Sequence, residues 1–123
     1  MNVTRIAEEF YARLDANDLD GAAGVFPEGA LLAIPGATAI SGDFRGRDVR
    51  PVLEKIVTAQ KAGRCRTERI CTYDGRKGVI YLFDNFVGEA QYHSAHEWVA
   101  RDGKLVAVMV YIHEYELFAK TWG

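Results

Sequence analysis

This chain contains few cysteines and no long run of apolar residues. Only two cysteines occur among 123 residues, Cys65 and Cys71. On one strand their α-carbons would lie about 20 Å apart at about 3.3 Å per residue, beyond the roughly 7 Å that a disulfide spans. We therefore expect reduced thiols and a cytoplasmic protein. No apolar segment approaches the roughly 20 residues that cross a bilayer, and the first residues lack a signal-peptide core, so secretion is not expected.

An excess of charge of one sign is also missing, and so are the usual cofactor motifs. The formal net charge is −2, with no basic stripe, so we expect neither a nucleic-acid nor a membrane partner. Gly42, Gly46 and Gly63 lack the spacing of a dinucleotide or phosphate-binding loop. His93 and His96 are three residues apart and point to opposite faces of a strand, which argues against a zinc site. The sequence therefore predicts no cofactor and no metal.

Apolar residues make up 49% of the chain, and their spacing changes from helical to alternating along it. Helices are expected at 3–15 with Asn2 as N-cap, at 19–26 with Asp18 as N-cap, and up to about residue 61 with Asp48 as N-cap. Strands are expected at 31–34, 38–40, 64–73, 79–87, 91–100 and 104–115, with a loop over 41–47. This order predicts one α+β domain over residues 1–123, with three N-terminal helices packed on a curved antiparallel sheet.

The most informative short pattern is Asp102-Gly103, which separates the last two strands. Asp-Gly favours a two-residue hairpin turn, because that turn needs positive φ at both central residues. Such a turn pairs Arg101 with Lys104 and decides which side chains share a face of the sheet. The face expected to line a pocket then carries Gln91, His93, Ala95, Glu97, Val108, Val110 and Ile112.

A second turn, Gly88-Glu89, predicts that Asp84 lies opposite His93 on the same face. A carboxylate beside an imidazole orients the ring and raises its basicity, which suits a general acid or base. With Glu114 close by on the last strand, the predicted catalytic residues are His93, Asp84 and Glu114. A structural hydrogen bond between Asp84 and His93 is the alternative, and a slip of one residue in the register would send Asp84 to the other face.

The opposite face of these strands is unusually aromatic. Because large apolar patches are rarely left in water, and aromatic residues and Met are enriched in interface cores, we expect a homodimer through this outer face. The alternative is that the C-terminal segment with Phe118 and Trp122 covers it. The residues expected there are Tyr81, Phe83, Tyr92, His96, Trp98, Met109, Tyr111 and His113.

Three stretches together resemble the SnoaL-like branch of the nuclear-transport-factor-2-like (NTF2-like) superfamily. They are Phe10 to Asp20 followed by Phe26, Ile34-Pro35-Gly36 followed by Ser41 to Asp48, and His96 to Val106, which continues to a carboxylate and Trp122. The resemblance implies a cone, formed by a curved sheet around a deep pocket that three helices close, and often a homodimer. With the hairpin registers, it implies a site for a small apolar metabolite lined by Phe10, Leu14, Ile34, Leu82, Phe86, Gln91, Ala95, Glu97, Val108, Val110 and Ile112.

The resemblance does not imply a reaction, because the superfamily contains isomerases, cyclases, hydrolases and pure binding modules. The three functional groups of ketosteroid isomerases are replaced here by Phe10, Ile34 and Ala95. The Arg-x-Asp of the epoxide hydrolases keeps only Asp84, and the terminal carboxylate of polyketide cyclases matches Glu114. Two hypotheses follow. One is an isomerase, cyclase or hydrolase using general acid/base catalysis, and the other is a non-catalytic binding or dimerisation module.

Overall fold

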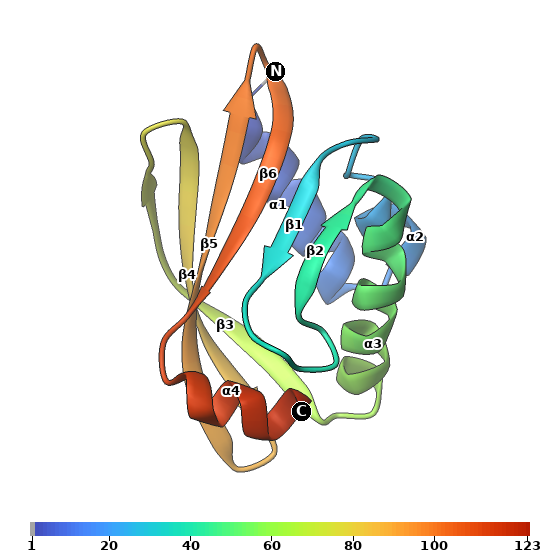
Figure 1. Ribbon diagram of the computed structural model, residues 1–123, viewed down its shortest axis with the longest axis vertical. Coiled ribbons are helices and arrows are strands. Elements are labelled where there is room, and N and C mark those ends of the chain that lie inside the picture. The colour runs from blue at the N-terminus through green and yellow to red at the C-terminus, as the bar shows by residue number, and fades with distance from the viewer. Residues whose placement is uncertain (1) are drawn as a thin grey trace.

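The computed structural model describes residues 2–123, and places helices on one side of a six-stranded curved sheet (Figure 1). The helices are α1 (Val3–Asp15), α2 (Leu19–Ala23), α3 (Val49–Lys61) and α4 (Tyr115–Trp122), with a short 3-10 turn at Gly46–Asp48. The strands are β1 (Leu31–Ile34), β2 (Gly42–Arg45), β3 (Cys65–Asp74), β4 (Gly78–Val87), β5 (Ala90–Arg101) and β6 (Lys104–Ile112).

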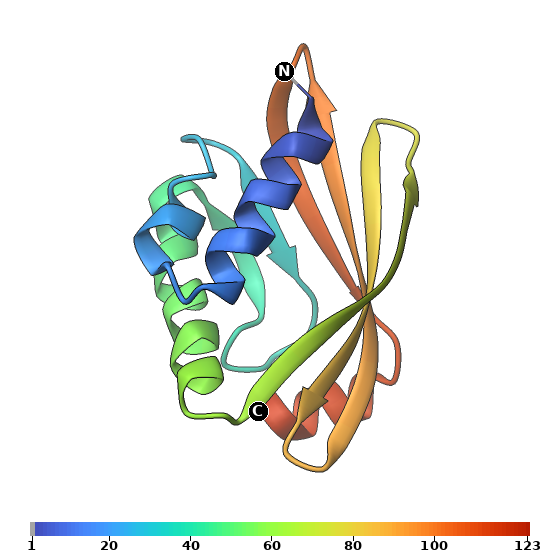
Figure 2. The ribbon, with the colours of Figure 1, turned by 180° about the vertical axis from the view of Figure 1, so that it is seen from behind.

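The sheet order is β2-β1-β6-β5-β4-β3, in which β1 runs parallel to β6 and every other neighbouring pair is antiparallel. The four long strands are strongly twisted, and α1, α2 and α3 all lie on the same side of them (Figure 2). The helix α4 lies at the end of the sheet away from the N-terminus of α1 (Figure 1). The predicted α+β cone is confirmed.

Local sequence signals account for the beginning of α1 and α2. The Asn2 side chain accepts a hydrogen bond from the Thr4 amide, and the Asp18 side chain accepts one from the Gly21 amide, so these two predicted caps are confirmed. Asp48 precedes α3, but its side chain makes no capping hydrogen bond. The buried stripe of α1 includes Phe10 and Tyr11, and this stripe faces the sheet. None of the helices within residues 2–123 is long and apolar enough to cross a membrane.

Two predictions of strand limits are wrong. Residues 38–41 form a turn, in which the Ser41 hydroxyl bonds the Thr38 amide and hydroxyl at 2.9 and 2.7 Å, and the strand follows at Gly42–Arg45. Hydroxyl groups that bond nearby backbone compete with strand pairing. The last strand ends at Ile112 because Glu114 has a φ of 52° and begins α4. The C-terminal segment is therefore a helix.

The consequential difference is a β-bulge in the β5–β6 hairpin. Arg101 pairs with Lys104 as expected, but the register shifts between Val99 and Ala100, so that Trp98 pairs with Val108. β6 has one extra residue at this point. Beyond the bulge, counting from the turn, each β5 side chain therefore lies on the face opposite to the one that the simple register predicts. The even-numbered residues of β5, from Tyr92 to Trp98, therefore face the helices.

Candidate functional site

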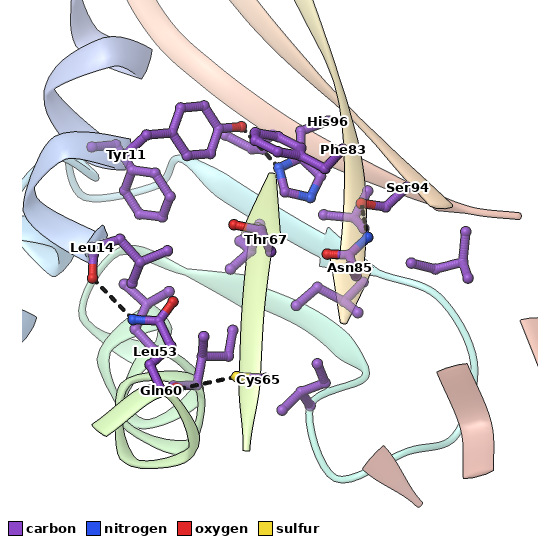
Figure 3. A pocket seen from close by; sticks show the side chains of 18 of the residues that line it. Tyr11, Leu14, Leu53, Gln60, Cys65, Thr67, Phe83, Asn85, Ser94 and His96 are labelled. Carbon is purple, nitrogen blue, oxygen red and sulfur yellow. Dashed lines mark hydrogen bonds between the residues drawn. The ribbon is translucent and has the colours of Figure 1, made fainter. Parts of the chain in front are cut away.

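A cavity of about 170 Å³ lies between the sheet and helices α1, α3 and α4 (Figure 3). Most of its lining is apolar, supplied by residues such as Leu53, Phe83 and Phe118. A cavity that is mostly apolar and carries a few convergent polar groups is the usual form of a small-molecule site. Six of the residues predicted to bind the ligand line this cavity, namely Phe10, Leu14, Ile34, Val108, Val110 and Ile112.

A chain of three side chains supplies the polar group in the wall of this cavity. The indole Nε1–H of Trp98 donates to the Tyr11 hydroxyl oxygen at 2.8 Å. That oxygen lies 2.8 Å from Nδ1 of His96. Because the Tyr11 oxygen already accepts from Trp98, its own proton is available for Nδ1, and we assign the imidazole proton to Nε2 on this basis. Figure 3 shows the second ring nitrogen turned away from Tyr11.

Burial keeps the side chains of His96 and Tyr11 uncharged at neutral pH. It lowers the pKa of His96 to about 4, because the site disfavours a charged ring. Burial also raises the pKa of the Tyr11 hydroxyl well above its usual value, against the opposing hydrogen bond from Trp98. His96 keeps some accessible surface because its ring borders the cavity. The cavity is thus offered a neutral N–H donor.

A second polar group lies further along the same wall. Asn85 on β4 and Ser94 on β5 are both buried, and both line the cavity. The Asn85 Nδ2 donates to the Tyr92 carbonyl oxygen at 3.2 Å and to the Ser94 hydroxyl oxygen at 2.9 Å. These bonds fix the orientation of the amide, because a carbonyl oxygen cannot donate and must face nitrogen.

Charged residues border the opening of the cavity. Arg69 binds the two carboxylate oxygens of Glu8 at 2.9 and 3.0 Å, and the Tyr81 hydroxyl donates to the same carboxylate at 2.7 Å. Burial raises the pKa of Glu8, but these hydrogen bonds outweigh it and the pKa is lowered. Asp15 also borders the cavity, where burial raises its pKa against the opposing charge of Arg69.

The three predicted catalytic residues come together outside the cavity. Asp84 pairs with His93 across β4 and β5 as predicted, and Nε2 of His93 lies 2.7 Å from the Asp84 carboxylate. On the other side of the ring, Nδ1 lies 2.8 Å from Glu114. None of these residues lines the cavity. The prediction that they face it is wrong, because the β-bulge turns His93 to the outer face.

This outer cluster is a pair of ion pairs on one imidazole. The hydrogen bond that the His93 ring donates to the Glu114 carboxylate is the main cause that raises the pKa of His93, with smaller contributions from Asp84. Burial raises the pKa of Glu114, but the hydrogen bonds from His93 outweigh it and lower it. Because His93 is bonded on both ring nitrogens, neither nitrogen is available to a ligand.

The same bulge displaces the other residues predicted to bind the ligand. Leu82, Phe86, Gln91, Ala95 and Glu97 do not line the cavity and lie on the outer face of the sheet. Conversely, most of the aromatic residues predicted for a dimer face point inward. Tyr81, Phe83, Tyr92 and Trp98 are buried, while Met109, Tyr111 and His113 remain outside.

Sequence reasoning missed Tyr11, Asn85, Ser94 and His96 as cavity residues. The available signal was polarity rather than turn type. Along β5 the odd positions include Gln91, His93 and Glu97, whereas the even positions include Tyr92 and Trp98. A side chain as large and apolar as Trp98 is more often buried than exposed. If this alternation of polarity had been given more weight than the turn sequence, His96 would have been predicted to face the cavity. Within residues 2–123, no three His, Cys, Asp or Glu side chains are arranged to hold a metal ion.

Solved structures share this architecture at low sequence identity. A protein of unknown function with a cystatin-like fold from Xanthomonas campestris is similar at a TM-score of 0.80 and 19% identity, covering 100% of this chain and 99% of that one. An NTF2-like protein from Burkholderia xenovorans is similar at a TM-score of 0.66 and 20% identity, and the match covers 98% of this chain and 95% of that one. A steroid delta-isomerase from Pseudomonas aeruginosa is similar at a TM-score of 0.73 and 19% identity, and the match covers 97% of this chain and 85% of that one.

No family model matches the sequence, and a search of curated proteins found no match. The chain has the NTF2-like, cystatin-like fold that the sequence resemblance implies. Because each identity is low, the likeness establishes the fold, and the site must carry the argument about function.

Proposed function

We propose that this chain binds a compact, mostly apolar molecule that carries a carbonyl or a similar hydrogen-bond acceptor. The observation that supports the proposal is the hydrogen-bonded series Trp98–Tyr11–His96, which aims a neutral N–H group into a mostly apolar cavity. A neutral donor favours an uncharged acceptor, since a carboxylate would lose its hydration without gaining a counter-charge.

The size of the cavity limits the ligand. An apolar cavity of about 150 Å³ is known to hold benzene, so about 170 Å³ suits one ring or a small fused pair. Burial of apolar surface contributes about 25 cal/mol per Å² to binding. A hydrogen bond to the His96 N–H adds about 1 kcal/mol and orients the molecule.

Indane and indanone provide a direct test, because they differ in a single carbonyl oxygen. Isothermal titration calorimetry gives the two dissociation constants for the wild type, for His96→Phe and for His113→Phe. We expect indanone to bind about fivefold tighter than indane in the wild type, as one hydrogen bond allows. The preference disappears in His96→Phe and remains in His113→Phe, where the exposed outer ring is changed. Failure of the wild type to bind either compound would refute the proposal.

A second candidate function is enzymatic proton transfer at the carbon next to a carbonyl. Asp15 borders the same cavity, and burial raises the pKa of its carboxyl, which makes its carboxylate a better base. Asp15 takes the proton from carbon, and the His96 N–H stabilises the enolate oxygen until the proton returns to a different carbon, which is an isomerisation. The fold is shared with a steroid delta-isomerase. Cyclisation and hydrolysis, the other reactions expected, have no comparable support in the cavity.

Hydrogen exchange tests this candidate without knowledge of the natural substrate. Indanone in D₂O exchanges the hydrogens beside its carbonyl when an enzyme forms the enolate, and proton NMR follows their loss. We expect exchange above the buffer rate with the wild type, a fall of at least tenfold with Asp15→Asn, and no change with the exposed Asp20→Asn. Binding of indanone without accelerated exchange would agree with the binding function and contradict the enzymatic one.

The proposed partners are this small molecule and a second copy of the chain, in the cytoplasm. The outer sheet face still exposes large apolar side chains, including Tyr73 and Tyr111, and both cysteines are free thiols. Sedimentation equilibrium of the wild type and of Tyr111→Glu tests the homodimer. A wild type that is monomeric at every concentration would contradict it.

A further inference from the structure

We propose that the cavity selects ligands with a hydroxyl group at the end opposite the carbonyl, and that Asn85 and Ser94 recognise this hydroxyl. The inference rests on the proposed binding function and names a chemical class for its ligand, a cyclic hydroxyketone. Neither residue was among those expected from the sequence to line the site.

The first step is the direction of the Asn85 amide. Its nitrogen is held by the Tyr92 carbonyl oxygen and by the Ser94 hydroxyl, which leaves Oδ1 as the part of the side chain free to accept. Figure 3 shows this oxygen on the opposite side of the amide from Ser94. Asn85 is only 7% exposed, and its remaining surface borders the cavity. A ligand hydroxyl that donates to Oδ1 thus satisfies an acceptor that would otherwise lose its access to water when the ligand fills the cavity.

The second step is the Ser94 hydroxyl. Its oxygen accepts from Asn85, and among residues 2–123 its proton has no acceptor. Ser94 is 6% exposed and lines the cavity. A hydroxyl group on the ligand can donate to Asn85 and accept from Ser94 at once, whereas a ligand carbonyl can satisfy only Ser94.

The third step is the distance between the two polar points. Ser94 and His96 are two residues apart on β5 and face the same side, so their Cα atoms are about 7 Å apart. Asn85 on β4 pairs with Tyr92, one level beyond Ser94, and its amide reaches back to the Ser94 hydroxyl at 2.9 Å. The separation of His96 and Ser94 is comparable to the span of a fused bicyclic ring, which suits a carbonyl at His96 and a hydroxyl at the contact between Ser94 and Asn85.

The selectivity follows from the cost of burial without a partner. A ligand that lacks the hydroxyl covers the Asn85 oxygen and the Ser94 proton with carbon, and both then lose their contact with water. Sites built in this way discriminate against the analogue without the hydroxyl more strongly than apolar pockets discriminate by size. We therefore expect the hydroxyl to increase affinity rather than merely be tolerated.

The experiment uses a set of four related compounds and ratios of their dissociation constants. The compounds are indane, indanone, indanone with a hydroxyl para to the carbon that bears the carbonyl, and indanol with the same hydroxyl alone. In the wild type we expect the hydroxyl to tighten binding of indanone roughly tenfold. A ratio within one protein cancels any general loss of affinity that a variant suffers.

Three variants locate the effect. Asn85→Leu removes the acceptor and is expected to reduce the tenfold ratio to about one. Ser94→Ala is a milder change and is expected to reduce the ratio by a factor of about two or more. Thr67→Val serves as the matched control, because it exchanges a hydroxyl for a methyl group in the cavity wall, at the β3 position opposite Asn85, and keeps the Asn85 amide and the Ser94 hydroxyl themselves. The ratio in Thr67→Val is expected to equal that of the wild type.

The outcomes separate the two proposals. If all four compounds bind but the hydroxyl gives no gain in the wild type, this inference is overturned and the binding function stands. The same holds if the gain survives in both Asn85→Leu and Ser94→Ala. If none of the compounds binds the wild type, the binding function fails and the inference fails with it.

Discussion

Acid should destabilise this protein through His96, because the folded chain holds that ring neutral. The pKa falls from the usual 6.5 to about 4 on folding, owing to burial. The unfolded chain therefore binds a proton on this residue at a higher pH than the folded chain does. The free energy of unfolding is fully retained above pH 6.5 and decreases as the pH falls from 6.5 toward 4.

The size of this effect follows from the same two values. Each pH unit between the two pKa values is worth about 1.4 kcal/mol. Near pH 4 the loss from His96 alone reaches about 3 kcal/mol, out of the roughly 5–15 kcal/mol that a domain has in total. Carboxylates that change pKa on folding titrate in an overlapping range, so a matched variant is needed to isolate the imidazole.

Urea unfolding at several pH values, followed by tryptophan fluorescence, measures the effect. His96→Gln keeps a polar side chain that can accept from Tyr11 but does not titrate. We expect the difference in unfolding free energy between wild type and His96→Gln to shift by about 3 kcal/mol in favour of the variant between pH 7 and pH 4. A difference that stays constant within about 0.5 kcal/mol would refute the burial of a neutral His96.

Three further outcomes are expected. Phe118→Ala removes a buried ring of α4 and should lower the unfolding free energy by about 3–5 kcal/mol, whereas Leu117→Ala on the exposed side of α4 should change it by less than about 1 kcal/mol; equal losses would contradict the packing. Tyr11→Phe leaves a buried indole N–H without its acceptor and should cost about 1–3 kcal/mol in urea unfolding; an unchanged midpoint would contradict the hydrogen-bond chain. The raised pKa of His93 means that its ion pairs stabilise the fold below pH 6.5 and are lost as the pH rises through the raised value; NMR titration should show this pKa fall in Glu114→Gln, and no fall would contradict the contact.

Much of the fold could be predicted because local signals and tertiary packing agree there. The caps Asn2 and Asp18 begin helices as their side-chain chemistry favours. The turns Gly88-Glu89 and Asp102-Gly103 close hairpins at the expected residues. The strand over 38–40 was wrong because hydroxyl bonds within the turn compete with pairing, a contest that residue type alone does not decide.

The candidate site was harder to predict, since it depends on a bulge that the turn sequence does not specify. The pairing of Asp84 with His93 was correct, yet the face was wrong, because faces were counted from Lys104 across the bulge. The predicted residues from α1 and from β6, such as Phe10 and Val108, do lie at the cavity. Their faces do not depend on the β5–β6 register.

The additional residue in β6 also limits what can be transferred from relatives. At identities of 19–20%, an alignment that is anchored on the tight turn and counted residue by residue, without the bulge, exchanges the outer side of β5 for its cavity side. Roles on this strand should therefore be transferred by superposed side-chain direction rather than by position in an alignment.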